Sequence, residues 1–223
     1  NSVKYKQEDT LPGIAFRGIG EGYSESTGVI NPQTESLVIV GGDLDVDKFI
    51  VKTMGQDQRS TQEAMKLKAL AHNFSNTFIK GDSITTPKSF DGLQLRLTGN
   101  QVVSNSAAAD GAALSLLKLD EAIDAVDGAN ALFMTKRVRR LLTAAARNTA
   151  VGGYITYEIG AFGRKVTMYN GLPIMIADAN SDLFATLGQN EAYTGGGTAD
   201  GTSVYAMRLE PGYLQGIQNS PPE

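Results

Sequence analysis

The hydrophobic and polar positions divide the chain into an extended first segment and two more regular regions. Within residues 3–53, the apolar runs Ile14–Arg17 and Leu37–Val40 flank a polar stretch that contains several glycines. This pattern predicts a long β-hairpin with a glycine-rich tip. Few residues of such a hairpin can be buried within one molecule, so we expect it either to find partners on other chains or to stay loosely ordered.

A helical periodicity follows the hairpin. From Ser60 to Lys80, apolar side chains recur at three- and four-residue spacing, which is typical of one face of an α-helix. Ser60 followed by Glu63 predicts a capping box at the start of this helix. Gly81 predicts a left-handed residue at its end, and Pro87 excludes any continuation soon afterwards.

Beyond residue 100 the pattern alternates between helices and strands. Helices are expected at Leu114–Val126, ending at Gly128, and at Val138–Ala145. Asn170-Gly171 is a strong two-residue hairpin signal. The expected strands are Ala131–Met134, Tyr154–Ile159, Arg164–Tyr169, Leu172–Ala177 and Ser203–Leu209. The whole pattern predicts an α+β protein.

Composition and charge narrow the function classes. The chain has 223 residues, 41% of them hydrophobic and 20% charged, which is an ordinary globular composition. Because it has no cysteine, disulfide frameworks and cysteine-ligated metal sites are excluded. The net charge of −4 argues against a protein whose main task is to bind phosphate backbones. No apolar run approaches the roughly 20 residues that span a bilayer, so we expect no membrane partner.

One short block is similar to the nucleophile motif of the GDSL-type serine hydrolases. The block is Gly81-Asp82-Ser83-Ile84. A serine nucleophile needs a base, and the only histidine, His72, precedes the serine on the predicted helix, whereas that family places it far downstream. We therefore favour a helix end followed by a turn, and we predict no catalytic residue.

A pattern of alternating aspartates also favours a structural explanation. Asp43, Asp45 and Asp47 alternate as in a calcium loop, but the glycine and the glutamate that such a loop needs are replaced by Lys48 and Met54. We expect these aspartates on a strand edge or capping a short helical turn, without a metal.

Three closely spaced glycines of the predicted hairpin resemble a dinucleotide-binding loop. Gly18, Gly20 and Gly22 are present, but Tyr23 stands where that motif needs its third glycine, and no βαβ unit follows. We interpret these glycines as a hairpin tip and expect no cofactor.

Basic residues cluster in the predicted helix around Val138–Ala145. Most of them fall opposite its apolar stripe, and we interpret them as a solvated helix face because the chain as a whole is acidic. The cluster comprises Lys136, Arg137, Arg139, Arg140 and Arg147.

The block Phe78–Asp82, followed by Pro87–Leu93, resembles the major capsid proteins of tailed bacteriophages, which share the Hong Kong 97 capsid fold with encapsulins. The residues that carry the resemblance are Gly81, Asp82, Phe90, Asp91, Gly92 and Leu93. The order of elements is similar too, since in that family a long hairpin, the E-loop, precedes a spine helix, the block and an α/β axial domain. The similarity covers roughly Lys4 to Ile217.

The resemblance implies three parts. Residues 1–56 would be the E-loop hairpin and its connections, 57–105 an incomplete peripheral domain with the spine helix, and 106–223 the axial domain, with pore-facing loops around Gly195–Gly201. Candidate contacts between subunits in the E-loop are Phe16, Arg17, Ile19, Glu21, Tyr23 and Glu25.

The function implied by the resemblance is structural and not enzymatic. The chain would be the major capsid protein of an icosahedral phage head that encloses double-stranded DNA, assembled in the bacterial host cytoplasm and located in the virion. Its partners would be copies of itself in hexamers and pentamers, a scaffolding segment, a portal and a maturation protease, without sequence-specific nucleic-acid binding. The alternatives are an encapsulin-like shell that packages protein cargo and a GDSL-type serine hydrolase.

Overall fold

The structure, a computed structural model, describes residues 2–54, 57–108, 111–147, 155–159, 165–177, 186–188, 191 and 201–218. The described chain separates into two units, which we call unit 1 (residues 2–39) and unit 2 (residues 40–218). Helices and strands are mixed, which confirms the α+β class.

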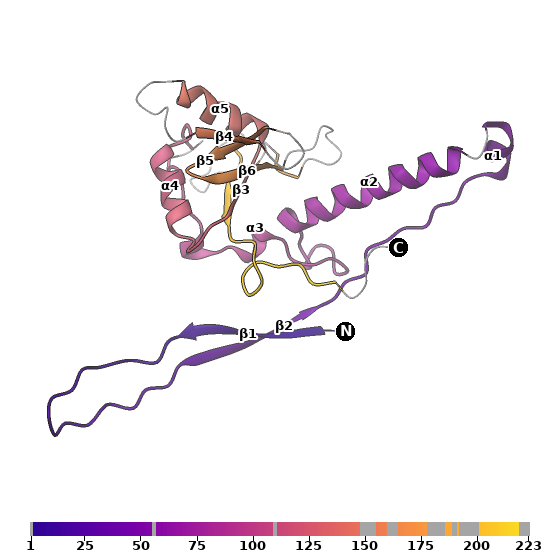
Figure 1. Ribbon diagram of the computed structural model, residues 1–223. Coiled ribbons are helices and arrows are strands. Elements are labelled where there is room, and N and C mark those ends of the chain that lie inside the picture. The colour runs from indigo at the N-terminus through magenta and orange to yellow at the C-terminus, as the bar shows by residue number, and fades with distance from the viewer. Residues whose placement is uncertain are drawn as a thin grey trace. The chain divides into compact units, whose positions relative to one another are not determined.

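Unit 1 is a two-stranded antiparallel ribbon. Strand β1 (Ser2–Thr10) pairs with β2 (Val29–Ser36), with Ser2 opposite Ser36 (Figure 1). The chain reverses at Gly20, whose φ of 86° needs glycine, so the predicted glycine tip is confirmed. Most strand positions are polar and none is buried, so apolar patterning does not determine where the pairing occurs.

The predicted strand positions in the hairpin are wrong. Ile14–Arg17 lies in the loop between the strands, and Leu37–Val40 follows β2 without belonging to it. The reason is that the ribbon has no buried face, so its apolar runs mark exposed surface instead of a core-facing strand.

Unit 2 begins with two helices, α1 (Lys48–Met54) and α2 (Asp57–Lys80). The Asp47 carboxylate accepts a hydrogen bond from the Phe49 N–H at 2.8 Å, which confirms a capping role for this aspartate. The predicted capping box at Ser60 and Glu63 is wrong, because α2 starts earlier and both residues lie inside it. Glu63 instead forms an ion pair with Arg59 at 3.1 Å.

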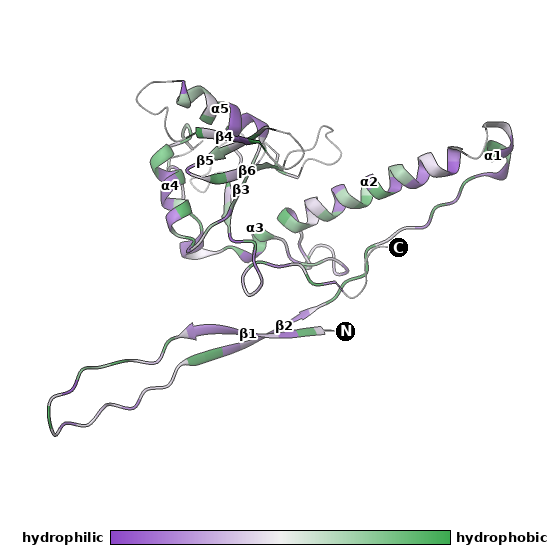
Figure 2. Cartoon of the chain, in the orientation of Figure 1, coloured by the Kyte–Doolittle hydropathy of each residue, from purple (hydrophilic) through white to green (hydrophobic). Residues whose placement is uncertain are grey.

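Helix α2 is buried at its C-terminal end. Ile79 is 1% exposed, whereas Leu67 and Phe74, which belong to the predicted apolar face, are 59% and 51% exposed. Apolar and polar residues alternate along the whole helix in Figure 2. The last turn is therefore the part that anchors α2 to the rest of unit 2.

The second half of unit 2 is built on a five-stranded sheet with the order β4-β5-β6-β3-β7. The pair β3–β6 is parallel, and the other neighbouring pairs are antiparallel. The strands are β3 (Ala131–Met134), β4 (Ile155–Ile159), β5 (Lys165–Tyr169), β6 (Leu172–Ile176) and β7 (Tyr205–Met207).

The predicted hairpin at Asn170-Gly171 is confirmed. The two residues have φ of 48° and 78°, as a tight hairpin turn with two left-handed residues requires, and they join β5 to β6. The predicted starts of two strands, Tyr154 and Arg164, lie outside the described residues, as do positions 195–200 of the predicted pore loop.

Helices α4 (Leu116–Asp124) and α5 (Lys136–Ala146) are close to their predicted positions. The hydroxyls of Ser115 and Thr135 cap them by accepting N–H bonds from Lys118 and Val138. Gly128, with φ of 71°, follows the end of α4. Two short helical turns, α3 (Leu93–Arg96) and η1 (Gly99–Gln101), connect α2 to this region.

Two hydrophobic clusters form the core of unit 2. The first packs α4 and α5 against the sheet and comprises Leu119, Ile123, Leu132, Met134, Val138, Leu142, Tyr169 and Ile174. The second joins the end of α2 to the sheet and comprises Ile79, Leu93, Ala131, Leu187, Tyr205 and Met207. Ala131 and Leu132 are neighbours on β3 but belong to different clusters, because successive strand residues face opposite sides. In the part of the chain that the structure describes, no helix is long and apolar enough to cross a bilayer.

Candidate functional site

The six residues that carry the family resemblance lie together in what we call the motif turn, residues 81–93. The Gly92 N–H donates to the Gly81 carbonyl at 2.8 Å. A Cβ on Gly81 would lie 2.3 Å from the Phe90 carbonyl oxygen, and one on Gly92 would lie 2.5 Å from the Gly81 nitrogen. Two stretches of backbone thus approach each other too closely for any side chain.

The predicted left-handed conformation of Gly81 is wrong. Gly81 is not among the described glycines with positive φ. Its N–H continues the helical pattern by donating to the Thr77 carbonyl at 2.7 Å. Glycine is needed at this position for the close backbone approach and not for a left-handed dihedral angle.

Two aspartates stabilise the motif turn. Asp82 accepts hydrogen bonds from the Thr85 hydroxyl at 2.6 Å and from the Ile84 N–H at 2.8 Å, and these bonds hold its pKa below the ordinary value. The Ser83 hydroxyl and N–H bond to Asp91 and lower the pKa of that carboxyl in the same way. Both carboxylates are therefore ionised acceptors that hold a turn, which makes them poor bases.

The interpretation of Gly81–Ile84 as a helix end followed by a turn is confirmed. Helix α2 ends at Lys80, and Ser83 begins a turn in which the Thr86 N–H donates to the Asp82 carbonyl at 2.9 Å. The hydrogen bonds of Ser83 are made to Asp91.

The apolar residues of the motif turn fasten α2 to the sheet. The ring of Phe90 lies 5.8 Å from that of Phe74 on α2. Leu93, which is 7% exposed, packs with Ile79 and with Tyr205 of β7. The motif turn is therefore a structural junction within unit 2.

Sequence reasoning missed a polar link beside this junction. The Gln94 side chain donates to Glu191 at 3.0 Å, and the Ser203 hydroxyl donates to the other oxygen of the same carboxylate. Burial raises the pKa of the adjacent Tyr205 hydroxyl. Nothing local in the sequence indicates this link, because Gln94 and Glu191 lie 97 positions apart.

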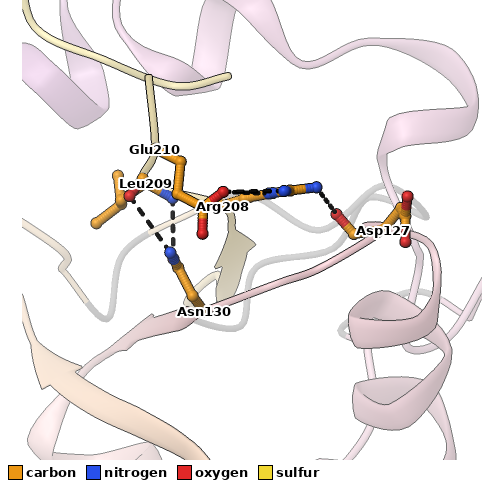
Figure 3. A network of polar contacts seen from close by, with 5 residues as sticks. All are labelled: Asp127, Asn130, Arg208, Leu209 and Glu210. Atoms are coloured by element: carbon orange, nitrogen blue, oxygen red, sulfur yellow. Dashed lines mark hydrogen bonds and ion pairs between the residues drawn. The ribbon is translucent and has the colours of Figure 1, made fainter. Parts of the chain in front are cut away.

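A second polar network surrounds Arg208, just beyond β7 (Figure 3). Its guanidinium bonds to Glu210 at 2.9 Å and to the Asp127 carbonyl at 3.2 Å, and lies 3.7 Å from the centre of the Tyr213 ring. Asn130 accepts from the Leu209 N–H at 2.9 Å and donates to the Leu209 carbonyl at 3.3 Å. The charge of Arg208 is thus paired within the chain, so we assign this network a structural role.

The E-loop candidates fall into two groups in unit 1. Arg17, Glu21 and Tyr23 meet at the tip, where the Arg17 guanidinium donates to the Glu21 carbonyl at 3.0 Å and lies 5.1 Å from the centre of the Tyr23 ring. The Glu21 carboxylate also accepts from the Gly18 N–H at 2.7 Å. Phe16 and Ile19 are 106% and 108% exposed, and Glu25 is exposed as well.

No protein-family model matches this chain, and no curated protein matches its sequence.

Proposed function

We propose that this chain is a self-assembling structural subunit of an icosahedral phage head with the Hong Kong 97-type capsid fold. The observation that carries the proposal is the surface of unit 1. In its described residues no side chain is buried, and large apolar side chains are exposed around its tip. These are Leu11, Ile14, Phe16, Ile19 and Tyr23.

Apolar side chains exposed to water on an isolated ribbon are unfavourable in free energy. An isolated two-stranded hairpin is at best marginally stable in water. Burial of one large apolar side chain such as Phe16 or Ile19 contributes about 1.5–3 kcal/mol. A contact that covers the tip supplies the stabilisation that the ribbon lacks, so several large apolar side chains exposed around one loop favour an interface with another molecule.

Unit 2 offers a second apolar surface of a different kind. Leu67 and Phe74, which are seven residues apart and so lie on one face of α2, are 59% and 51% exposed. A hairpin that binds a different surface on the next copy makes a heterologous contact, and such contacts form rings when the rotation between copies closes. Many modest contacts of this type hold each subunit in a shell.

The resemblance in the motif turn supplies the finer part of the proposal. Unit 1 would be the E-loop, α2 the spine helix of the peripheral domain, and the sheet with α4 and α5 the axial domain. The copies would form hexamers and pentamers around double-stranded DNA in the virion, with a scaffolding segment, a portal and a maturation protease as further partners, and the chain would not act as an enzyme.

Sedimentation and electron microscopy of the full chain test this proposal. We expect the unmodified protein to form closed particles. The double variant Phe16→Ser and Ile19→Ser should stay dispersed at the same concentration, because its tip no longer buries apolar surface. Ser24→Ala, an exposed change in the same loop, should assemble normally and serves as the matched control.

Two results would contradict the proposal. One is an unmodified chain that stays dispersed at every concentration, and the other is a double variant that assembles as well as the control. Particles that package a protein cargo would instead contradict the phage-head assignment and favour an encapsulin-like shell.

A further inference from the structure

A basic hollow is lined by residues of α5 and of the strands β4 and β5. Its volume is about 370 Å³, and its lining includes Arg139, Arg140, Thr143, Arg147, Tyr157 and Thr167. Helix α5 lies next to β4, the edge strand of the sheet, in Figure 1. Three arginines and three residues with hydroxyl groups therefore line one open space within unit 2.

The fold itself gathers these charges. Val138 and Leu142 face the core at 5% and 0% exposure, which directs Arg140 and Arg147 to other sides of α5. The Thr143 hydroxyl donates to the Arg139 carbonyl at 2.9 Å and so stays close to the helix. The predicted position of the basic residues opposite the apolar stripe is confirmed, and the hollow is an additional feature.

Strands β4 and β5 contribute two residues with hydroxyl groups to the hollow, and the carboxylate of β4 lies on the opposite face of the sheet. Tyr157 and Thr167 are paired directly across β4 and β5, so their side chains share one face of the sheet. Glu158 follows Tyr157 and pairs with Val166, which places it on the opposite face. The nearest acidic residue of β4 is thus directed away from the hollow.

The positive charge of the hollow is not neutralised within the described chain. None of its described lining residues is acidic. The ion pairs found among the described residues involve Arg59, Lys118 and Arg208, and not the arginines of the hollow. A guanidinium presents several N–H donors in a planar fork that fits the oxygens of a phosphate.

The spacing of the arginines along α5 favours a chain of phosphates over a single anion. Arg140 and Arg147 are seven residues apart, which is about 10 Å along a helix axis at about 1.5 Å per residue. One strand of duplex DNA presents a phosphate every ~3.4 Å along its axis. Hydroxyls such as those of Thr143 and Thr167 are also common phosphate contacts.

We infer that this hollow is a sequence-independent contact site for the phosphate backbone of a nucleic acid. The inference goes beyond the shell proposal and does not rest on it, because the site lies within unit 2 of a single chain. It also agrees with the net charge of −4, since three local arginines produce a weak contact that depends on salt.

Fluorescence anisotropy of a labelled 20-base-pair duplex with the full chain tests the inference. Three phosphate contacts predict a slope of about −2.7 for the logarithm of the association constant against the logarithm of salt concentration. Between 50 and 200 mM salt this slope corresponds to an affinity loss of about 40-fold. The slope should not change with the base sequence of the duplex.

Matched variants locate the contact. Arg140→Gln with Arg147→Gln should weaken binding at 50 mM salt by at least about tenfold and flatten the slope by about 2. Arg137→Gln with Lys88→Gln removes the same charge from exposed positions outside the hollow and should bind nearly as the unmodified chain does. Arg140→Lys retains the charge and should retain the slope. Circular dichroism checks that each variant is folded.

Three results would overturn the inference. The first is no duplex binding by the unmodified chain at 50 mM salt. The second is an equal loss in the two double variants, because the total charge and not the hollow would then account for binding. The third is displacement of the duplex by stoichiometric pyrophosphate, which would mean that the hollow is a site for a small anion.

Discussion

Gly81 sits where the end of α2 meets the returning chain of the motif turn. A Cβ at this position would lie 2.3 Å from the Phe90 carbonyl oxygen and 2.5 Å from the Thr77 carbonyl oxygen. Both atoms belong to the backbone, so neither can rotate away as the end of a flexible side chain can. Gly81→Ala should therefore destabilise the protein by about 1–3 kcal/mol, as overpacking does elsewhere. Urea unfolding followed by circular dichroism measures this change.

Gly41→Ala is the matched control for this prediction. A Cβ on Gly41 meets no described atom within 4 Å. Its effect on the free energy of unfolding should stay within about 0.5 kcal/mol, as for most surface substitutions. If the two variants were equally stable, the close approach at Gly81 would not constrain the motif turn.

The same residue shows what sequence reasoning can and cannot predict at this scale. A glycine directly after a helix is a common left-handed cap, and that interpretation of Gly81 was wrong. The real constraint comes from Phe90, nine positions later, and appears only when the turn is folded. By contrast, the left-handed pair Asn170-Gly171 was predicted correctly, because a two-residue hairpin is determined by its own local sequence.

At the scale of elements, α5 shows how one helix separates core from surface. Leu141 and Leu142 are adjacent and chemically identical, yet they are 50% and 0% exposed. Leu142→Ala should cost about 2–5 kcal/mol of unfolding free energy, because it leaves a cavity between α5 and the sheet. Leu141→Ala, the control, should cost less than about 1 kcal/mol in the same urea titration. Similar losses in both variants would contradict the packing of α5 against the sheet.

Elements were predictable from the sequence where a buried face imposes a period. Helices α4 and α5 were found from apolar spacing, and strand β3 from its continuous apolar run, because each buries residues in the first core cluster. The strands of unit 1 were misplaced because neither face of that ribbon is buried. The start of α2 was misplaced for a related reason, since its first turns are exposed and their residues do not define a core-facing stripe.

At the scale of the whole molecule, the two units differ in how they are stabilised. Unit 2 has two hydrophobic clusters and links distant segments, as Gln94 and Glu191 do across 97 positions. No pattern in the sequence predicts such a pair, because only the folded sheet and α3 bring its members together. Unit 1 consists of one pair of strands and exposed apolar residues, so its stable form in our proposal depends on other copies of the chain.

Trypsin provides a direct measure of that dependence. Arg17 is the single trypsin site between Lys6 and Lys48, and it lies at the exposed tip of unit 1. We expect rapid cleavage after Arg17 in dispersed subunits, because an exposed loop tip is a preferred site of proteolysis. In assembled particles the same cleavage should be at least about tenfold slower, because the tip is covered and cleavage must wait for local opening. Mass spectrometry of the fragments follows both rates.

Two comparisons make this experiment decisive. Arg17→Gln should abolish the cleavage in dispersed subunits, which assigns the fragment to this position. Arg17→Lys restores a trypsin site and should show the same protection in particles. A tip that resists trypsin in the dispersed subunit would mean that unit 1 is already stabilised within its own chain. It would then need no neighbour, and the exposed apolar side chains at its tip would no longer argue for assembly.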